Sequence, residues 1–125
     1  MSPELEKAEQ QIKKLLKIVD ESDSFEDPAS LSRIMVRLSY ANHVVGRHLA
    51  QLQFDYRQKR SEVYNEVMQD EKAKVTHAKQ KGEEAAQELE QLFDHYTNIH
   101  TDTGTFITVC QTHLRILGME AKSQL

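Results

Sequence analysis

The sequence contains no tryptophan, one cysteine, two prolines and four glycines in 125 residues, and aromatic residues make up only 6% of it. This scarcity of turn-forming and ring-bearing residues argues against a β protein with many strands and hairpins. The single cysteine, Cys110, excludes an intramolecular disulfide and fits a reducing compartment. No apolar run approaches the roughly 20 residues that cross a bilayer, so we expect no membrane partner. Charged residues interrupt the first ten positions, so we expect no leader peptide and a cytoplasmic location.

Charge is plentiful but nearly balanced, with 16 basic and 20 acidic residues and a net charge of −4. This balance argues against a domain that grips duplex DNA mainly through a positive surface. The 29% of charged residues and the 38% of hydrophobic residues are typical of extended helical proteins and coiled coils.

Apolar residues at steps of three and four predict four helices in one domain spanning residues 1–125. The first covers residues 4–20, where Ser2 and Pro3 fit the cap and the first turn. A long helix covers residues 28–68 after an acidic linker, with Asp27 as its cap and Phe25 as a possible hydrophobic anchor. Its main stripe ends at Tyr56 and consists of Leu31, Ile34, Leu38, Ala41, Val45, Leu49, Leu52 and Tyr56.

The polar stretch after Met68 allows two interpretations. Either the chain turns back around residues 69–75 with Thr76 capping a new helix, or one helix continues past residue 90. We favour the turn because a charged stretch without an apolar stripe has no face to bury.

A return helix is predicted over residues 76–100 by a regular heptad seam, which consists of Val75, Ala78, Gly82, Ala85, Leu89, Leu92, Tyr96 and Ile99. Gly82 in this seam indicates close approach of the facing helix. The Thr101–Thr105 segment predicts a break, followed by a C-terminal helix over residues 104–117 that Gly118 caps. The predicted fold is therefore all-α, an elongated, coiled-coil-like helical hairpin with an N-terminal helix and a C-terminal helix.

Features of an enzyme are missing. The six histidines form no zinc-binding motif with each other or with Cys110, and neither a phosphate-binding glycine loop nor a nucleophile elbow occurs. We therefore expect no catalytic residues, no metal and no cofactor.

A basic and aromatic cluster is the local feature that suggests a function. Residues 57–81 contain seven basic and four acidic residues, a net charge of +3. A turn near residues 69–75 would gather these basic groups at one end of the hairpin, and Tyr56 and Tyr64 could stack on bases. The candidate nucleic-acid-binding residues are Arg57, Lys59, Arg60, Tyr64, Lys72 and Lys74. The competing interpretation is a solvated tip whose charges serve solubility.

Apolar residues also occur away from the main stripe of the long helix, among them Met35, Val36, Val44, Ala50 and Phe54. A two-helix hairpin would leave them in water, and exposed apolar surface of that extent marks interfaces. We therefore expect a homo-oligomer whose interface includes Met35, Val44, Phe54, Leu89, Leu92 and Tyr96.

Two stretches resemble a known family. Residues 59–64, Lys-Arg-Ser-Glu-Val-Tyr, are similar to the basic, acidic and tyrosine spacing that ends the long helix of small UvsY-type phage recombination mediators. Residues 114–122 are similar to a terminal ending of leucine, glycine and a basic residue in the relatives from siphophage recombination clusters. The resemblance covers residues 40–125.

This resemblance implies a cyclic homo-oligomer, located in the cytoplasm of a bacterial host, that binds single-stranded DNA. Such a protein helps to load a recombinase onto strands covered by single-strand-binding protein. Lys59, Arg60 and Tyr64 match the DNA-contacting segment of the family. The alternative is a helical protein-interaction module, an adaptor or an inhibitor of a host protein, that binds no nucleic acid.

Overall fold

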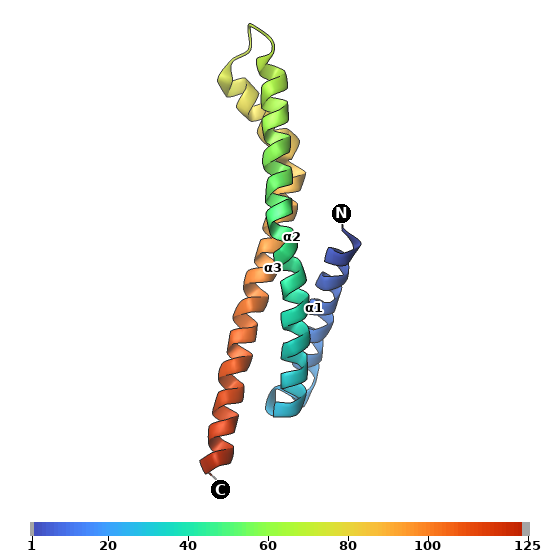
Figure 1. Ribbon diagram of the computed structural model, residues 1–125, viewed down its shortest axis with the longest axis vertical. Coiled ribbons are helices and arrows are strands. Elements are labelled where there is room, and N and C mark those ends of the chain that lie inside the picture. The colour runs from blue at the N-terminus through green and yellow to red at the C-terminus, as the bar shows by residue number, and fades with distance from the viewer. Residues whose placement is uncertain (1, 124–125) are drawn as a thin grey trace. The chain divides into compact units, whose positions relative to one another are not determined.

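The computed structural model describes the backbone of residues 2–123 and the side chains of residues 2–118. Within this range the chain forms the helices α1 (Pro3–Glu21), α2 (Pro28–Met68) and α3 (Val75–Ser123), and a 3₁₀ turn, η1 (Asp23–Glu26), lies between α1 and α2 (Figure 1). No strand occurs among the described residues. The all-α class is thus confirmed.

Both predicted N-terminal caps are present. The Ser2 hydroxyl accepts a hydrogen bond from the Leu5 amide at 3.4 Å, and an Asp27 carboxylate oxygen accepts one from the Ala29 amide at 3.3 Å. The Ser30 hydroxyl donates to the other Asp27 oxygen at 2.6 Å, and this bond is the main reason that the pKa of Asp27 is lowered. These side chains satisfy amides that have no partner inside their helix.

The predicted turn between α2 and α3 is confirmed at residues 69–74. The Asp70 carboxylate accepts a hydrogen bond from the Lys72 amide at 3.0 Å and holds the turn. The predicted cap at Thr76 is wrong, because α3 begins at Val75 and the Ala78 amide bonds to the Lys74 carbonyl at 3.0 Å.

The predicted break at Thr101–Thr105 is wrong, and so is the division into helices 76–100 and 104–117. A single helix passes through both Gly104 and the predicted cap Gly118. The Thr105 and Thr108 hydroxyls each donate to the carbonyl four residues earlier, at 3.1 Å, and so need no partner outside the helix. Thr103 is buried, which shows that part of this polar segment faces the neighbouring helices.

The chain divides into two compact units, and α2 and α3 each contribute to both. The three-helix unit contains residues 1–46 and 98–125, and the hairpin unit contains residues 47–97. In the three-helix unit, the apolar faces of α1, α2 and α3 form a core that includes Leu5, Ile12, Leu15, Leu31, Leu38, Val45 and Cys110. Burial also raises the pKa of the Cys110 thiol.

A polar contact joins α2 to α3 inside the three-helix unit. The Asn42 side-chain amide donates to the His100 carbonyl at 3.1 Å, and His100 Nδ1 lies 3.2 Å from the Asn42 carbonyl and 3.1 Å from its Oδ1. Both atoms that face Nδ1 are acceptors, so Nδ1 carries the hydrogen. A Cβ at Gly46 would lie only 2.9 Å from the His100 ring, so glycine leaves room for this contact.

The linker between α1 and α2 is tied to α3 by an aromatic stack. The rings of Phe25 in η1 and His113 in α3 lie 4.1 Å apart, with 14° between their planes. Phe25 was predicted to anchor α2, whereas this ring contact is made with α3.

In the hairpin unit, α2 and α3 run antiparallel from the turn (Figure 1). Ala78, Ala86 and Tyr96 of α3 are buried there. The predicted seam is wrong at two positions, because Ala85 is exposed in place of Ala86 and Val75 is 49% exposed at the start of the helix. The predicted role of Gly82 is confirmed, since a Cβ there would lie 2.6 Å from the Arg60 carbonyl oxygen.

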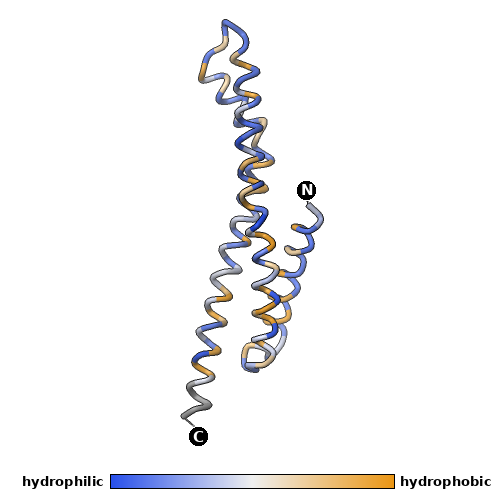
Figure 2. Tube along the Cα trace, viewed as in Figure 1, coloured by the Kyte–Doolittle hydropathy of each residue, from blue (hydrophilic) through white to orange (hydrophobic). Residues whose placement is uncertain are grey.

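Apolar and polar residues alternate along each described helix (Figure 2). Among the described residues, none of the helices combines the length and the apolar character that crossing a bilayer requires.

Candidate nucleic-acid interface

The hairpin unit brings two of the predicted nucleic-acid-binding residues together. Arg60 and Tyr64 stand one turn apart on α2, and both line a shallow hollow that Lys79 of α3 also lines. Glu83 of α3 lies at the same hollow, together with Ser61 and Asn65. An exposed guanidinium, an exposed ammonium and a half-buried phenol therefore surround one surface depression.

Arg57 lies in the adjoining hollow. Its lining consists of Ala50, Gln53, Phe54, Arg57, Gln58 and Ser61. Ser61 belongs to both hollows, so Arg57 and Arg60 border a continuous stretch of one side of α2. No acidic residue lines the hollow of Arg57, and Glu83 is the acidic residue of the hollow of Arg60 and Tyr64.

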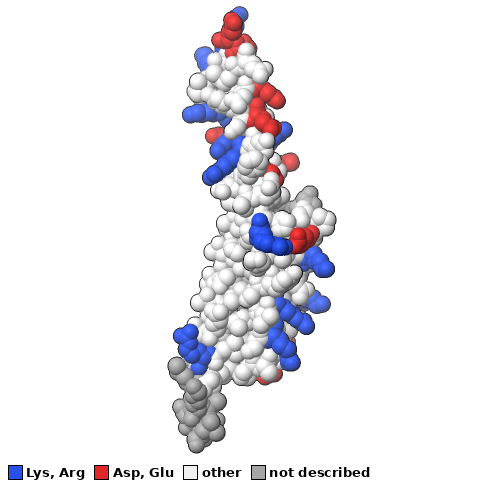
Figure 3. Space-filling model, in the orientation of Figure 1, with Lys and Arg blue, Asp and Glu red and all other residues white. Residues whose placement is uncertain are grey.

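Lys59 lies outside both hollows. Neighbouring residues of a helix point about 100° apart, so Lys59 does not share the side of Arg60. Helical spacing instead places Lys59 on the side of Glu62 and Glu66. In Figure 3, basic side chains accordingly gather mainly on the left of the hairpin unit, and acidic ones mainly at its tip and on its right.

Lys72 and Lys74 meet at the turn, separate from Arg57 and Arg60. They line a third hollow with Glu66, Val67, Asp70, Ala73 and His77. The two acidic residues oppose the two lysines there, which weakens any attraction for phosphate. The basic residues of 57–81 are therefore divided among separate hollows and do not form one cluster.

Tyr56 supports the site from inside. Its ring packs against Phe93 of α3 with 5.5 Å between centroids, and the Arg60 guanidinium lies 5.9 Å above the same ring. A cation over a ring face is attracted to it, so Tyr56 helps to orient Arg60. The prediction that Tyr56 offers a free ring face for base stacking is not supported, because Phe93 and Arg60 occupy its surroundings.

Gly82 fixes the height at which α3 passes Arg60. Lys79 lines the same hollow as Tyr64, whereas Lys81 lies 3.7 Å from Glu84 in an exposed ion pair. The candidate set did not include Lys79, which reaches this hollow through the pairing of α3 with α2.

Two residues of the predicted oligomer interface are buried within the chain. Val44 is 5% exposed and Tyr96 is 1% exposed, so neither can contact a second copy while this fold persists. Helix α1 explains the burial of Val44, which lies beside Ala8 of that helix. Met35, Leu89 and Leu92 are half-buried, and Phe54 is 57% exposed.

Among the side chains of residues 2–118, no group of three or more His, Cys, Asp or Glu is placed to hold a metal ion. Comparisons with protein-family models, with curated proteins and with solved structures find no significant match to the chain. Any assignment of function therefore rests on the surfaces described above and on the resemblance at residues 59–64 and 114–122.

Proposed function

We propose that the hairpin unit binds single-stranded DNA with little dependence on base sequence, and that the protein has no enzymatic activity. The observation that carries this proposal is the common hollow of Arg60, Tyr64 and Lys79, with Arg57 in the hollow beside it. Proteins that bind single strands combine cationic groups for the phosphates with aromatic rings for the bases. In this proposal, Arg57, Arg60 and Lys79 contact phosphates, and the Tyr64 ring stacks on a base.

Binding of this kind depends on salt in a calculable way. Each phosphate contact to a single strand contributes about 0.7 to the slope of log affinity against log salt concentration. Replacing Arg57 and Arg60 by alanine should therefore reduce the slope by about 1.4. Tyr64→Leu should weaken binding by about tenfold, within the range of one stacked base, and should leave the slope nearly unchanged.

The test is fluorescence anisotropy of a labelled single-stranded oligonucleotide titrated with the full chain at several salt concentrations. Lys13→Ala/Lys17→Ala is the matched control, because it removes two exposed basic residues of α1 in the other unit. The expected result is a loss of affinity and of slope in Arg57→Ala/Arg60→Ala alone. Equal losses in both double variants, or no binding by the wild type at low salt, would refute the proposal.

The position of Lys59 supplies a second comparison. The resemblance includes Lys59 in the DNA-contacting segment, whereas the hollows that contain Arg57 and Arg60 exclude it. We expect Lys59→Ala to weaken binding less than Arg60→Ala does. A larger effect of Lys59→Ala would move the contact surface to the other side of α2.

We further propose that this binding assists the loading of a recombinase onto strands covered by single-strand-binding protein, as the resemblance implies. Self-association is part of the proposal, and Phe54 is the most exposed of the predicted interface residues. Light scattering should show a multimer for the wild type and a smaller mass for Phe54→Ser.

A protein-interaction module that binds no nucleic acid is the second candidate. The observation that favours it is apolar surface, since Val36 is 65% exposed and Tyr40 is 71% exposed. Strand-exchange assays separate the candidates. Stimulation of a recombinase that is lost in Arg57→Ala/Arg60→Ala supports the first, and an effect that this variant retains supports the second.

A further inference from the structure

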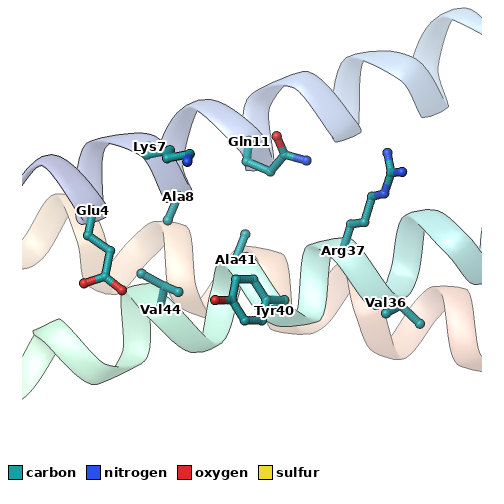
Figure 4. Close-up of a pocket in the computed structure, with 9 residues that line it drawn as sticks. All are labelled: Glu4, Lys7, Ala8, Gln11, Val36, Arg37, Tyr40, Ala41 and Val44. Carbon is teal, nitrogen blue, oxygen red and sulfur yellow. The ribbon is translucent and has the colours of Figure 1, made fainter.

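A groove runs between α1 and α2 in the three-helix unit (Figure 4). Its volume is about 550 Å³. Ala8 of α1 and Ala41 and Val44 of α2 are the small apolar residues along it, and all three are buried. The rest of the lining consists of Glu4, Lys7, Gln11, Val36, Arg37 and Tyr40.

Two large apolar side chains border this groove without cover from the chain itself. They are Val36 and Tyr40, the two most exposed of the large hydrophobic residues that the structure describes. A second, smaller hollow continues along the same pair of helices beyond Arg37, and Ile18 lines it. A contiguous apolar surface of this kind marks a binding site more often than scattered apolar residues do.

The charged residues around the groove are mostly basic. Lys7 stands on α1 and Arg37 on α2, while Arg33 lines the continuation of the groove and Glu4 is the acidic residue of the lining. The chain as a whole is acidic, so this local excess of positive charge is a property of the groove. Figure 3 shows basic side chains along the right-hand part of the three-helix unit.

We propose that this groove docks an acidic amphipathic helix of another protein. Two antiparallel helices present a channel in which a third helix can lie, with apolar residues at every third or fourth position pointing inward. The lining residues on α2 extend from Ser30 to Val44, which corresponds to about 20 Å of helix and to an occupant of about 14 residues. Acidic residues beside the apolar stripe of the occupant would meet Lys7, Arg33 and Arg37.

The charges of the groove decide between a protein partner and a second copy. A two-fold dimer places the same patch of both copies face to face. Two such grooves would bring Arg37 and Lys7 of one copy toward the same residues of the other, and like charges repel. An acidic helix from a different protein neutralises them.

The apolar residues decide between a protein and a nucleic acid. Phosphates would satisfy Arg33 and Arg37, but they would leave the exposed side chains of Val36 and Tyr40 without an apolar partner. An amphipathic helix covers the apolar residues and the basic residues at once, which gives it the more complete complementarity.

The test uses the full chain and a labelled helical peptide of about 16 residues, long enough to cover the groove, with leucine at every third or fourth position and glutamate on both sides of that stripe. A matched peptide carries lysine in place of each glutamate. In anisotropy titrations, the acidic peptide should bind at least about tenfold more tightly than the lysine peptide.

Two variants with matched controls locate the peptide. Arg37→Glu should weaken binding by about tenfold or more, whereas Lys13→Glu, an exposed reversal on α1 outside the lining, should change it little. Val36→Ser/Tyr40→Ser should weaken binding similarly, and Val109→Ser, an exposed apolar residue of α3, should not. Circular dichroism of each variant verifies that the helices persist.

Each contrary outcome overturns the proposal. Absence of peptide binding up to about 200 μM, far weaker than specific recognition, or equal effects of Arg37→Glu and Lys13→Glu, would show that the groove is no docking site. Loss of oligonucleotide binding in Arg37→Glu would assign the groove to nucleic acid, and loss of a multimer in Val36→Ser/Tyr40→Ser would assign it to a second copy. The proposed DNA site uses other residues in the other unit, so the two proposals fail independently.

Discussion

Replacing Gly82 by alanine tests the close helix contact on which the candidate DNA site depends. A Cβ at residue 82 would lie 2.6 Å from the Arg60 carbonyl oxygen and 3.3 Å from Arg60 Cγ. The nearer atom belongs to the backbone of α2, so a rotation of a side chain cannot relieve the overlap. One helix must move away from the other.

Two opposing terms set the size of the effect. Alanine is favoured over glycine inside a helix by about 1 kcal/mol. Overpacking between elements costs about 1–3 kcal/mol, and a clash with backbone belongs in the upper part of that range. We therefore expect Gly82→Ala to lower the free energy of unfolding by about 1–2 kcal/mol, against the gain that helix propensity alone predicts.

Gly104→Ala is the matched control. Gly104 also lies inside α3, but its added Cβ would meet only the Asn42 side-chain amide at 3.8 Å, an ordinary contact. This variant should be more stable than the wild type by about 0.5–1 kcal/mol. Urea denaturation followed by circular dichroism measures both variants. A Gly82→Ala variant as stable as Gly104→Ala would show that α3 does not pass Arg60 at this distance.

Three further predictions concern single side chains. Asp27→Ala should destabilise the protein at pH 7. Because the native pKa of Asp27 is lowered, the stability that its carboxylate contributes is present above about pH 4 and is lost as the pH falls through the lowered value. Urea denaturation should therefore show a smaller difference in stability between variant and wild type at pH 3 than at pH 7. Asn42→Ala leaves His100 Nδ1 with one acceptor fewer and should cost about 1–3 kcal/mol in the same assay, whereas a cost below about 0.5 kcal/mol would contradict the buried contact. Cys110 should react with a thiol reagent at pH 8 at least about tenfold more slowly in native protein than in urea. The reason is that burial restricts the access of the reagent and raises the pKa of the thiol. Equal rates would contradict the position of Cys110 in the core.

Helix positions and the turn were predictable because they depend on local chemistry. Serine or aspartate followed by proline marks the start of α1 and of α2, and both start within one residue of the predicted position. The turn at residues 69–74 follows from the loss of an apolar stripe after Met68. These features need no knowledge of what lies next to them in space.

The break at Thr101–Thr105 was mispredicted because its residues have weak helix propensity and their tertiary contacts are not visible in the sequence. Thr103 is buried, and Gly104 lies beside Asn42 of α2. Packing supplies the stability that propensity lacks, and it overrides the local preference for a turn. The same reasoning covers Ala85 and Ala86, two neighbouring alanines whose burial only the facing helix decides.

The residues of the candidate site likewise differ in whether local sequence alone could identify them. Sequence reasoning found Arg57, Arg60 and Tyr64 because they lie close together in the chain, and it grouped Lys59 with them for the same reason. Helical geometry separates Lys59, and this separation could have been calculated from 100° per residue.

Lys79 required one further step, the pairing of α3 with α2. A turn displaced by two residues would shift the pairing of α3 with α2 by about four residues and move Lys79 by about 6 Å along α2. Lys79 would then leave the hollow of Arg60 and Tyr64. The glycine at residue 82 favours this pairing, because a Cβ at the same position would collide with the Arg60 backbone. The glycine that permits the close contact therefore also determines which basic residues can act together.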